Sequence, residues 1–338
     1  MSVSHLLLIG AGFSRNWGGW LSSEAFEYLL GCPEISQDIQ LQRLLWKHQG
    51  TGGFEDALDE IQTLYLQDRQ GKERQLAALQ TAVGRMFADM NRTFLDLVDW
   101  EFQREDRSRL VQRFLTQFDA VFSLNQDLLL ERHYCNRNIA LVGAKSWLGV
   151  ELPGMQRTPG PEPLYSECWA RSVWVPRPAA EFRFNKQHQP LFKLHGSSNW
   201  NSAEGKQLLV MGGGKAIEIG RSPILSWYST QFEQYLCQPG ARLMVIGYGF
   251  RDLDINAIIS RAVSKALRIF VTAPDGAELA FKLSPTRQRA QIIVPSEIEE
   301  TLKQSLIGAS RRPLRDMFGG DNAEFSKVMR FFEAGKNT

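Results

Sequence analysis

Four short apolar runs along the chain are each followed at once by glycines or small polar residues. Runs of this length are typical of strands buried on both faces of a parallel sheet. The runs cover His5–Ile9, Ala120–Leu124, Leu191–Leu194 and Leu243–Ile246. Because parallel strands end at one edge of a sheet, where ligands bind, we expect the residues after these runs to form one site.

Between the first and second runs, apolar residues recur instead at the spacing of a helix. Residues 22–118 are therefore predicted to be almost wholly helical, a module inserted after the first strand. The pattern over Gln75–Phe102 is long for one globular helix, and a break is expected near Gly84 or Asn91.

The second half of the chain changes character at residue 190. Residues 143–189 are rich in proline and tryptophan and are predicted to form an irregular insertion or lid, with one strand over Glu181–Asn185. Beyond them strands and helices alternate, which favours a parallel sheet. The expected strands are Gln207–Met211, Arg242–Ile246 and Arg268–Thr272, and the expected helices are Pro223–Leu236, Leu253–Leu267, Ser296–Leu306 and Ala323–Phe332.

These patterns predict one α/β domain over residues 1–338, a Rossmann-like parallel sheet flanked by helices, with a large helical insertion after the first strand. The chain is long enough to bury a core of that size. The expected parts are a core over 1–21, 119–142 and 190–275, the helical insertion over 22–118, the irregular insertion or lid over 143–189, and a C-terminal helical tail over 276–338.

Composition narrows the class of protein. The 338 residues carry a formal net charge of +2, so no strong basic field favours direct binding of nucleic acid. The four cysteines lie far apart with no C-x-x-C pair, which argues against a zinc ribbon and for reduced thiols. No apolar window approaches the roughly 20 residues of a membrane span, and Leu6–Ile9 is too short for a signal peptide. We therefore expect a soluble cytoplasmic protein.

Two of the strand ends carry glycine turns. The first, Gly10-Ala11-Gly12-Phe13-Ser14, has a spacing that lets the backbone approach a pyrophosphate. Arg15 stands where a complete dinucleotide fingerprint has its third glycine, so a tight strand-to-helix turn is an equal alternative. The second turn, Gly247-Tyr248-Gly249-Phe250, repeats the design, and Asp252 behind it could bond ribose hydroxyls, cap the next helix, or both.

The other two strand ends carry polar side chains. Asn125 and Asp127 could hold ribose hydroxyls or a carboxamide, and capping of the next helix is the alternative. His195 precedes Gly196, and a neutral imidazole at a strand end can accept a proton from a hydroxyl or a water. A purely structural histidine is the alternative. We interpret Asn125, Asp127 and His195 as catalytic, and Gly10 to Ser14, Gly247, Gly249 and Asp252 as binding residues.

The segment Met211-Gly212-Gly213-Gly214-Lys215 looks like a phosphate-binding loop but does not match one. Leu209 stands where the first glycine belongs, and Ala216 replaces the required serine or threonine. We therefore predict a hairpin or a flexible turn there.

In their order along the chain, the four strand ends resemble the sirtuin-like family. The matching residues are Gly10-Ala11-Gly12-x-Ser14, Asn125-x-Asp127, His195-Gly196 and Gly247-x-Gly249. Deacetylating sirtuins carry a four-cysteine zinc module and a Pro-Asp-Phe-Arg stretch, and this chain has neither; Asn16–Trp20 stands in place of the latter. The sequences Gly247–Asn256 and Phe54–Leu58 are instead similar to the bacterial branch of the family found in antiphage defence.

The resemblance implies an NAD+ glycohydrolase that cleaves NAD+ to nicotinamide and ADP-ribose and depletes NAD+ in the infected cell. NAD is then the substrate and no metal is involved. It also implies control by a homo-oligomer or by a partner such as a HerA-type ATPase or a prokaryotic Argonaute. Two other readings stay open: a regulatory module that binds NAD or ADP-ribose without turnover, and an NAD-dependent deacylase or ADP-ribosyltransferase that has lost its zinc.

Overall fold

The centre of the protein is a seven-stranded sheet in which every paired strand is parallel. The structure is a computed structural model that describes residues 3–50, 52–135, 147–158, 168–212, 214–282 and 297–333. The strands lie in the order β11-β10-β9-β1-β2-β6-β3. Their bounds are β1 His5–Ile9, β2 Ala120–Ser123, β3 Val150–Glu151, β6 Gln189–Lys193, β9 Arg242–Ile246, β10 Arg268–Thr272 and β11 Leu306–Ser310. The predicted Rossmann-like α/β fold is confirmed.

The strand β1 lies in the middle of this sheet and fixes its register. Ile9, the last residue of β1, is level with Ser123 of β2 on one side and with Ile246 of β9 on the other. Ser123 is in turn level with Lys193, the last residue of β6. Four strands therefore end at one edge, and the four candidate segments leave the sheet there.

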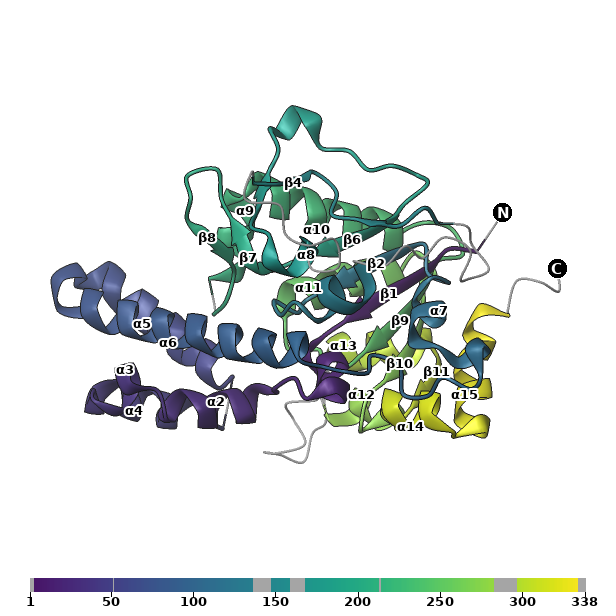
Figure 1. Cartoon of the computed structure of the whole chain (residues 1–338), viewed down its shortest axis with the longest axis horizontal. Helices are drawn as coiled ribbons and strands as arrows, with labels where there is room; N and C mark the ends of the chain where they lie inside the picture. The colour runs from purple at the N-terminus through teal and green to yellow at the C-terminus, as the bar shows by residue number, and fades with distance from the viewer. Residues whose placement is uncertain are drawn as a thin grey trace.

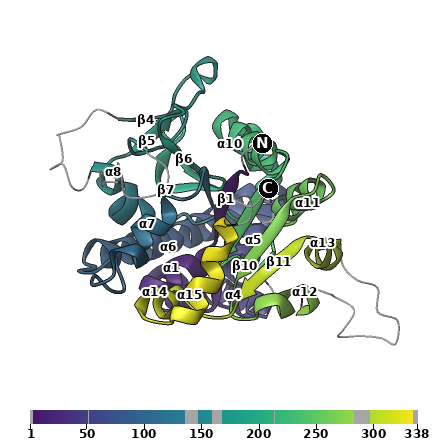
Figure 2. The same cartoon turned by 90° about the vertical axis from the view of Figure 1, so that its right-hand side faces the viewer.

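Helices cover both faces of the sheet (Figures 1 and 2). On one face Phe122 of β2 packs on Phe232 of α10, with ring centroids 4.8 Å apart. On the other face Phe118 contacts Phe332, with centroids 5.0 Å apart. The helices that follow the insertion are α8 Cys168–Arg171, α9 Lys215–Arg221, α10 Pro223–Leu236, α11 Leu253–Val263, α12 Leu279–Lys282, α13 Glu297–Ser305, α14 Leu314–Gly319 and α15 Asn322–Met329.

The insertion between β1 and β2 is mostly helical, as predicted for residues 22–118, although the described residues 96–106 contain no helix. Its helices α2 to α6 form an arm beside the sheet (Figure 1). The predicted break in its long helix does not occur, because α6 is continuous over 27 residues, about 40 Å. Gly84 has open space around it, and Asn91 turns its side chain to partners outside the helix. The helices before β2 are α1 Ala11–Ser14, α2 Ser22–Leu30, α3 Pro33–Ser36, α4 Ile39–His48, α5 Phe54–Gln67, α6 Arg69–Leu95 and α7 Val111–Leu115.

The segment predicted to be irregular contributes to two sheets. Its strand β3 joins the main sheet, and a second sheet has the order β4-β5-β7-β8. The strand predicted over Glu181–Asn185 is absent, because Ala179–Glu181 is a 3-10 turn and the backbone N–H of Asn185 donates to the Glu151 carboxylate rather than to a strand. The bounds in the second sheet are β4 Met155–Arg157, β5 Trp174–Pro176, β7 Gly196–Asn201 and β8 Gln207–Leu209.

The predicted helical tail over 276–338 also needs correction. It contains β11, which pairs with β10 and extends the main sheet. Gly308 lies inside that strand because a Cβ there would approach the Phe270 ring to 2.6 Å. A glycine in a five-residue run weakens the strand pattern in the sequence. Within the described ranges, no helix combines the length and the apolar character needed to cross a membrane.

The glycine turns that follow β1 and β9 pack backbone against backbone. The N–H of Gly12 donates to the carbonyl of Gly247 over 2.9 Å. A Cβ on Gly12 would lie 2.7 Å from the Gly247 Cα, and Gly247 itself has a φ of +67°. The glycines therefore form the predicted tight turn, and this role does not depend on whether they also bind a ligand.

We expect Gly12→Ala to lower the free energy of unfolding by about 1–3 kcal/mol, because the new methyl group overpacks a rigid backbone contact. Gly84→Ala is the matched control, since its added Cβ meets nothing within 4 Å and a mid-helix alanine gains roughly 0.5–1 kcal/mol. Urea denaturation of both variants measures the difference. A Gly12→Ala protein as stable as the wild type would contradict the packing.

Candidate functional site

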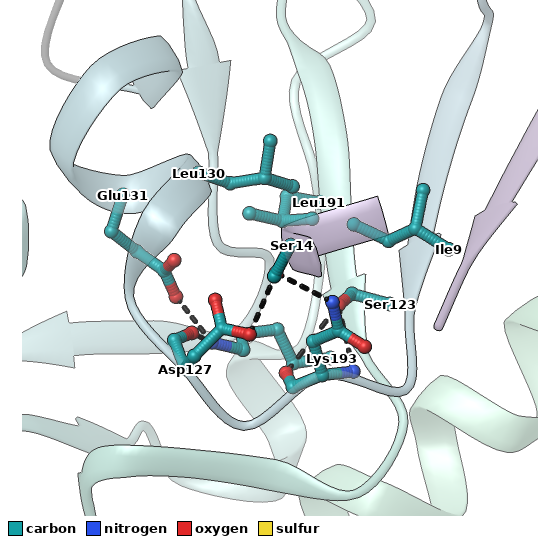
Figure 3. Close-up of a pocket in the computed structure, with 9 residues that line it drawn as sticks. Ile9, Ser14, Ser123, Asp127, Leu130, Glu131, Leu191 and Lys193 are labelled. Carbon is teal, nitrogen blue, oxygen red and sulfur yellow. Dashed lines mark hydrogen bonds and ion pairs between the residues drawn. The ribbon is translucent and has the colours of Figure 1, made fainter. Parts of the chain in front are cut away.

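Three of the predicted residues meet in one hydrogen-bonded network at the carboxyl edge of the sheet. The Ser14 hydroxyl donates to Asp127 Oδ2 over 2.8 Å and accepts from Asn125 Nδ2 over 3.0 Å. Figure 3 shows the Ser14 side chain pointing from the segment after β1 toward Asp127 in the segment after β2. Asp127 also caps the helical turn behind it, because its Oδ1 accepts from the N–H of Leu129. The binding and capping roles of Asp127 are thus compatible.

The pocket beside this network is narrow. Its lining includes Ser14, Asn125, Asp127, Glu131 and Lys193, and it is too tight to hold a water molecule. All five side chains are buried. A ligand therefore fits here only if these side chains move apart.

A buried lysine lies under the network. The Lys193 ammonium donates to the backbone oxygen of Asp127 and to Glu131 Oε1, both over 2.6 Å, and to the Ser197 hydroxyl over 2.7 Å. Lys193 and Glu131 are each about 1% exposed. Glu131 opens a short π-helical turn over Glu131–Cys135. The position of Lys193 at the end of β6 brings its ammonium between two candidate segments.

Burial decides the protonation behaviour of the two carboxyl groups nearest Lys193. It raises the pKa of Asp127, against the opposing effects of the Lys193 charge and the Ser14 hydrogen bond. Burial likewise raises the pKa of Glu131, opposed by the charge and the hydrogen bond of Lys193. The lysine thus acts against the protonation of both groups.

His195 meets a different carboxylate. Its Nε2 lies 3.2 Å from Asp252 Oδ2, and Lys215 Nζ lies 3.7 Å from the same oxygen. Asp252, which was predicted to bond ribose hydroxyls, to cap the next helix, or both, lies beside the candidate base. Its other oxygen, Oδ1, caps α11 by accepting from the N–H groups of Asp254 and Ile255. One carboxylate therefore both caps a helix and faces the histidine.

The pKa of Asp252 is lowered to about 2. Burial on its own would raise this pKa, but the contact with His195, the positive charge that His195 carries when protonated, the Lys215 charge and the helix cap together outweigh burial. Asp252 is therefore a carboxylate throughout the neutral range.

Two atoms at this contact have no hydrogen-bond partner among the described residues. They are His195 Nε2 and Asp252 Oδ2, which lie at ion-pair distance but without hydrogen-bond geometry. Buried polar atoms are normally satisfied, so two such atoms side by side indicate a place where a ligand hydroxyl or a water binds. The side chains are only 5% and 9% exposed.

Apart from Ser14, the glycine turns offer the site their backbone rather than side chains. Ala11 is exposed, whereas the Phe13 ring is buried against Trp17, with centroids 5.2 Å apart, and belongs to the core. Gly249 is exposed with open space around it, so a ligand can approach its backbone. The next residue, Phe250, has a φ of 53°, a left-handed conformation that is rare for a bulky side chain. Such strain gathers at functional sites.

Three charged residues of the site were not predicted: Glu131, Lys193 and Lys215. A lysine inside the apolar run Leu191–Leu194 was the available signal for Lys193. Lys215 belongs to the glycine-rich segment that was set aside as a false phosphate loop, and it begins α9 after a turn. Its Nζ lies 2.5 Å from Glu55 Oε2, which comes from the helical insertion.

The insertion also reaches the site through Asn91 of α6. The Asn91 amide nitrogen donates to the Ser198 hydroxyl, and its oxygen accepts from the N–H of Leu128, both over 2.9 Å. Ser198 follows His195 closely, and Leu128 follows Asp127. One side chain of the arm therefore contacts both candidate catalytic segments.

Comparison with protein-family models and with curated proteins finds no match for this chain. The residues that the structure describes contain no group of three or more histidine, cysteine, aspartate or glutamate side chains placed to hold a metal ion. The site is therefore interpreted from its own residues.

We expect Asp252→Asn to remove a pH-dependent part of the stability. Because the folded-state pKa lies below the ordinary value of 3.8, the carboxylate stabilises the fold by about 2 kcal/mol above pH 4, and this contribution disappears as the pH falls towards 2. Asparagine keeps a capping oxygen. Urea denaturation between pH 7 and pH 3 should show the gap between wild type and variant narrowing.

The control for this measurement is Asp316→Asn, an exposed aspartate far along the chain in α14. A constant gap between wild type and Asp252→Asn across that pH range would contradict the assignment.

Proposed function

We propose that the protein is an NAD+ glycohydrolase, which cleaves NAD+ to nicotinamide and ADP-ribose. The observation that carries the proposal is the buried contact of His195 Nε2 with Asp252 Oδ2, which lie at ion-pair distance without a hydrogen bond. The contact lies at the edge where glycine turns and polar strand ends converge. A histidine next to an ionised carboxylate suits acceptance of a proton from a water or a ribose hydroxyl. The resemblance to the sirtuin-like family names the nucleotide.

The reaction needs little covalent chemistry from the protein. The bond between the ribose C1′ and the nicotinamide nitrogen breaks, and its electron pair leaves with nicotinamide as a neutral group. A water oxygen bonds to C1′ and gives its proton to His195. The Asp252 carboxylate stabilises the imidazolium that forms. Asn125 and Asp127 hold the nicotinamide ribose and carboxamide, and correct placement supplies much of the acceleration.

Binding has to open the narrow pocket around Ser14, Asn125 and Asp127. These side chains bond one another, and a ligand would exchange those hydrogen bonds for its own. The exposed backbone of Gly249 and the turn Gly10–Ser14 offer surfaces for the rest of the dinucleotide. An anionic pyrophosphate would also find a cation in Lys215.

The biological part of the proposal rests on the resemblance alone. It is depletion of NAD+ in the bacterial cytoplasm during antiphage defence, under the control of a homo-oligomer or of a partner such as a HerA-type ATPase or a prokaryotic Argonaute. The contacts of Asn91 and Glu55 with the site give the helical insertion a physical route for such control.

A regulatory module that binds NAD or ADP-ribose without turnover is the second candidate function. The mutual hydrogen bonds of Ser14, Asn125 and Asp127 favour it, because a closed network can be a resting structure with no catalytic role. The deacylase or ADP-ribosyltransferase alternative has no comparable support among the contacts of the site.

We expect purified protein, alone or with the product of its genomic neighbour, to release nicotinamide from NAD+. His195→Ala should lower the rate at least about 100-fold, the usual contribution of a positioned acid–base group. Asn125→Ala should lower it by a similar factor, about 100-fold, because the substrate is no longer held in place. His188→Ala is the matched control, since this histidine precedes the same strand, contacts Glu151 and lies away from the site. Chromatography of nicotinamide measures the rate.

Two results would overturn the glycohydrolase. Wild-type rates in well-folded His195→Ala protein would remove the histidine from catalysis. Binding of NAD+ by calorimetry, with no nicotinamide released under any condition, would favour the regulatory module.

A further inference from the structure

The buried ammonium of Lys193 has a partner for each of its three hydrogens. The acceptors are the Asp127 backbone oxygen, Glu131 Oε1 and the Ser197 hydroxyl, at 2.6, 2.6 and 2.7 Å. A lysine ammonium has three donors and no acceptor, so its hydrogen-bonding capacity is fully used. No donor is left over for a substrate.

The three acceptors belong to two segments that the mechanism requires to act together. Asp127 and Glu131 follow β2 and carry one set of polar groups, whereas Ser197 lies in β7, two residues after His195. Two backbone bonds support the same junction: Leu194 N–H donates to Ser123 O and Ser198 N–H donates to Gln126 O, both over 2.9 Å. Lys193, together with the Glu131 carboxylate, adds an ion pair to these backbone contacts.

The cost of this arrangement argues for a role beyond stability. A buried ion pair is often no more stabilising than apolar side chains of similar volume, because both charges lose their hydration. The residues before Lys193 in β6, Leu191 and Phe192, are apolar and buried. A lysine at the end of such a strand is therefore not needed to build the sheet.

We infer that Lys193 is a positioning residue, which fixes the segment of Asn125 and Asp127 relative to the segment of His195. It acts through the Asp127 backbone and Ser197 and does not contact the substrate. The expected effect of Lys193 on turnover rests on the proposed glycohydrolase function. The expected effect of Lys193 on the relative position of the two segments does not depend on that function.

The test removes the ion pair without leaving a buried charge behind. Lys193→Met alone would strand the Glu131 carboxylate, so the variant is Lys193→Met with Glu131→Gln. The matched control is Gln189→Leu, at the other end of the same strand. Gln189 is also fully buried; it donates to the carbonyls of Leu115 and Phe118 over 2.8 Å and accepts from the Tyr134 hydroxyl. Its loss therefore disturbs buried hydrogen bonds while leaving the three contacts of the Lys193 ammonium in place.

We expect the double variant to fold and to lose about 100-fold in kcat for nicotinamide release, with KM for NAD+ changed far less, because misplacement of about 1 Å costs this much. The Gln189→Leu variant should keep the wild-type kcat at temperatures below the melting temperature of the variant. Equal kcat in the double variant and the wild type would overturn the inference.

Amide hydrogen exchange provides a readout that does not depend on the substrate. In the double variant, protection should fall at the amides of Ser198 and Leu128, while Gln189→Leu leaves both unchanged. If the wild-type protein releases no nicotinamide, the glycohydrolase proposal fails and exchange still decides the role of Lys193. Unchanged protection at both amides in the double variant would overturn that role.

Discussion

The parallel register of β1 between β2 and β9 is the constraint on which the rest of the molecule depends. Ile9 is level with Ser123 and with Ile246, and Ser123 is level with Lys193. Strands that end level deliver their following segments into one small volume. Polar groups in that volume have little water to bond, so they bond one another. The Ser14 network and the Lys193 cluster both follow from this crowding.

Polar groups at the strand ends fall into two kinds. Around Lys193 every hydrogen of the ammonium has an acceptor, and a fully satisfied buried network of this kind is rigid. Between His195 and Asp252 two buried atoms face each other without a hydrogen bond. The hydrogen bonds of Lys193 hold the backbone segments in fixed positions, whereas the contact of His195 with Asp252 leaves atoms that can bond a ligand or a water. A site needs both, since a reacting group must be held still while its own bonding remains incomplete.

The sequence predicts this fold well where a strand or helix has clear boundaries. The strands His5–Ile9 and Arg268–Thr272 and the helix Pro223–Leu236 have the predicted bounds, because glycine, proline or polar residues delimit an apolar run. The sequence does not predict an element whose residues are explained by contacts with remote parts of the chain. The strand β11, for example, contains Gly308, and only the Phe270 ring packed against it explains why a glycine is needed there. Lys193 and Glu131 are 62 residues apart in the chain, and no local pattern announces that pair. The sequence indicates which residues at the strand ends belong to the site, but it does not indicate which of these residues contact one another.

The contact between the turns after β1 and β9 has an evolutionary consequence. A tight contact between two side chains can drift, because an enlargement on one side is offset by a reduction on the other. Such compensation is impossible between Gly12 and Gly247, because neither residue has a side chain that could become smaller if the other became larger. The two positions are therefore locked as a pair, and relatives that keep this sheet edge are expected to vary everywhere around them before they vary there.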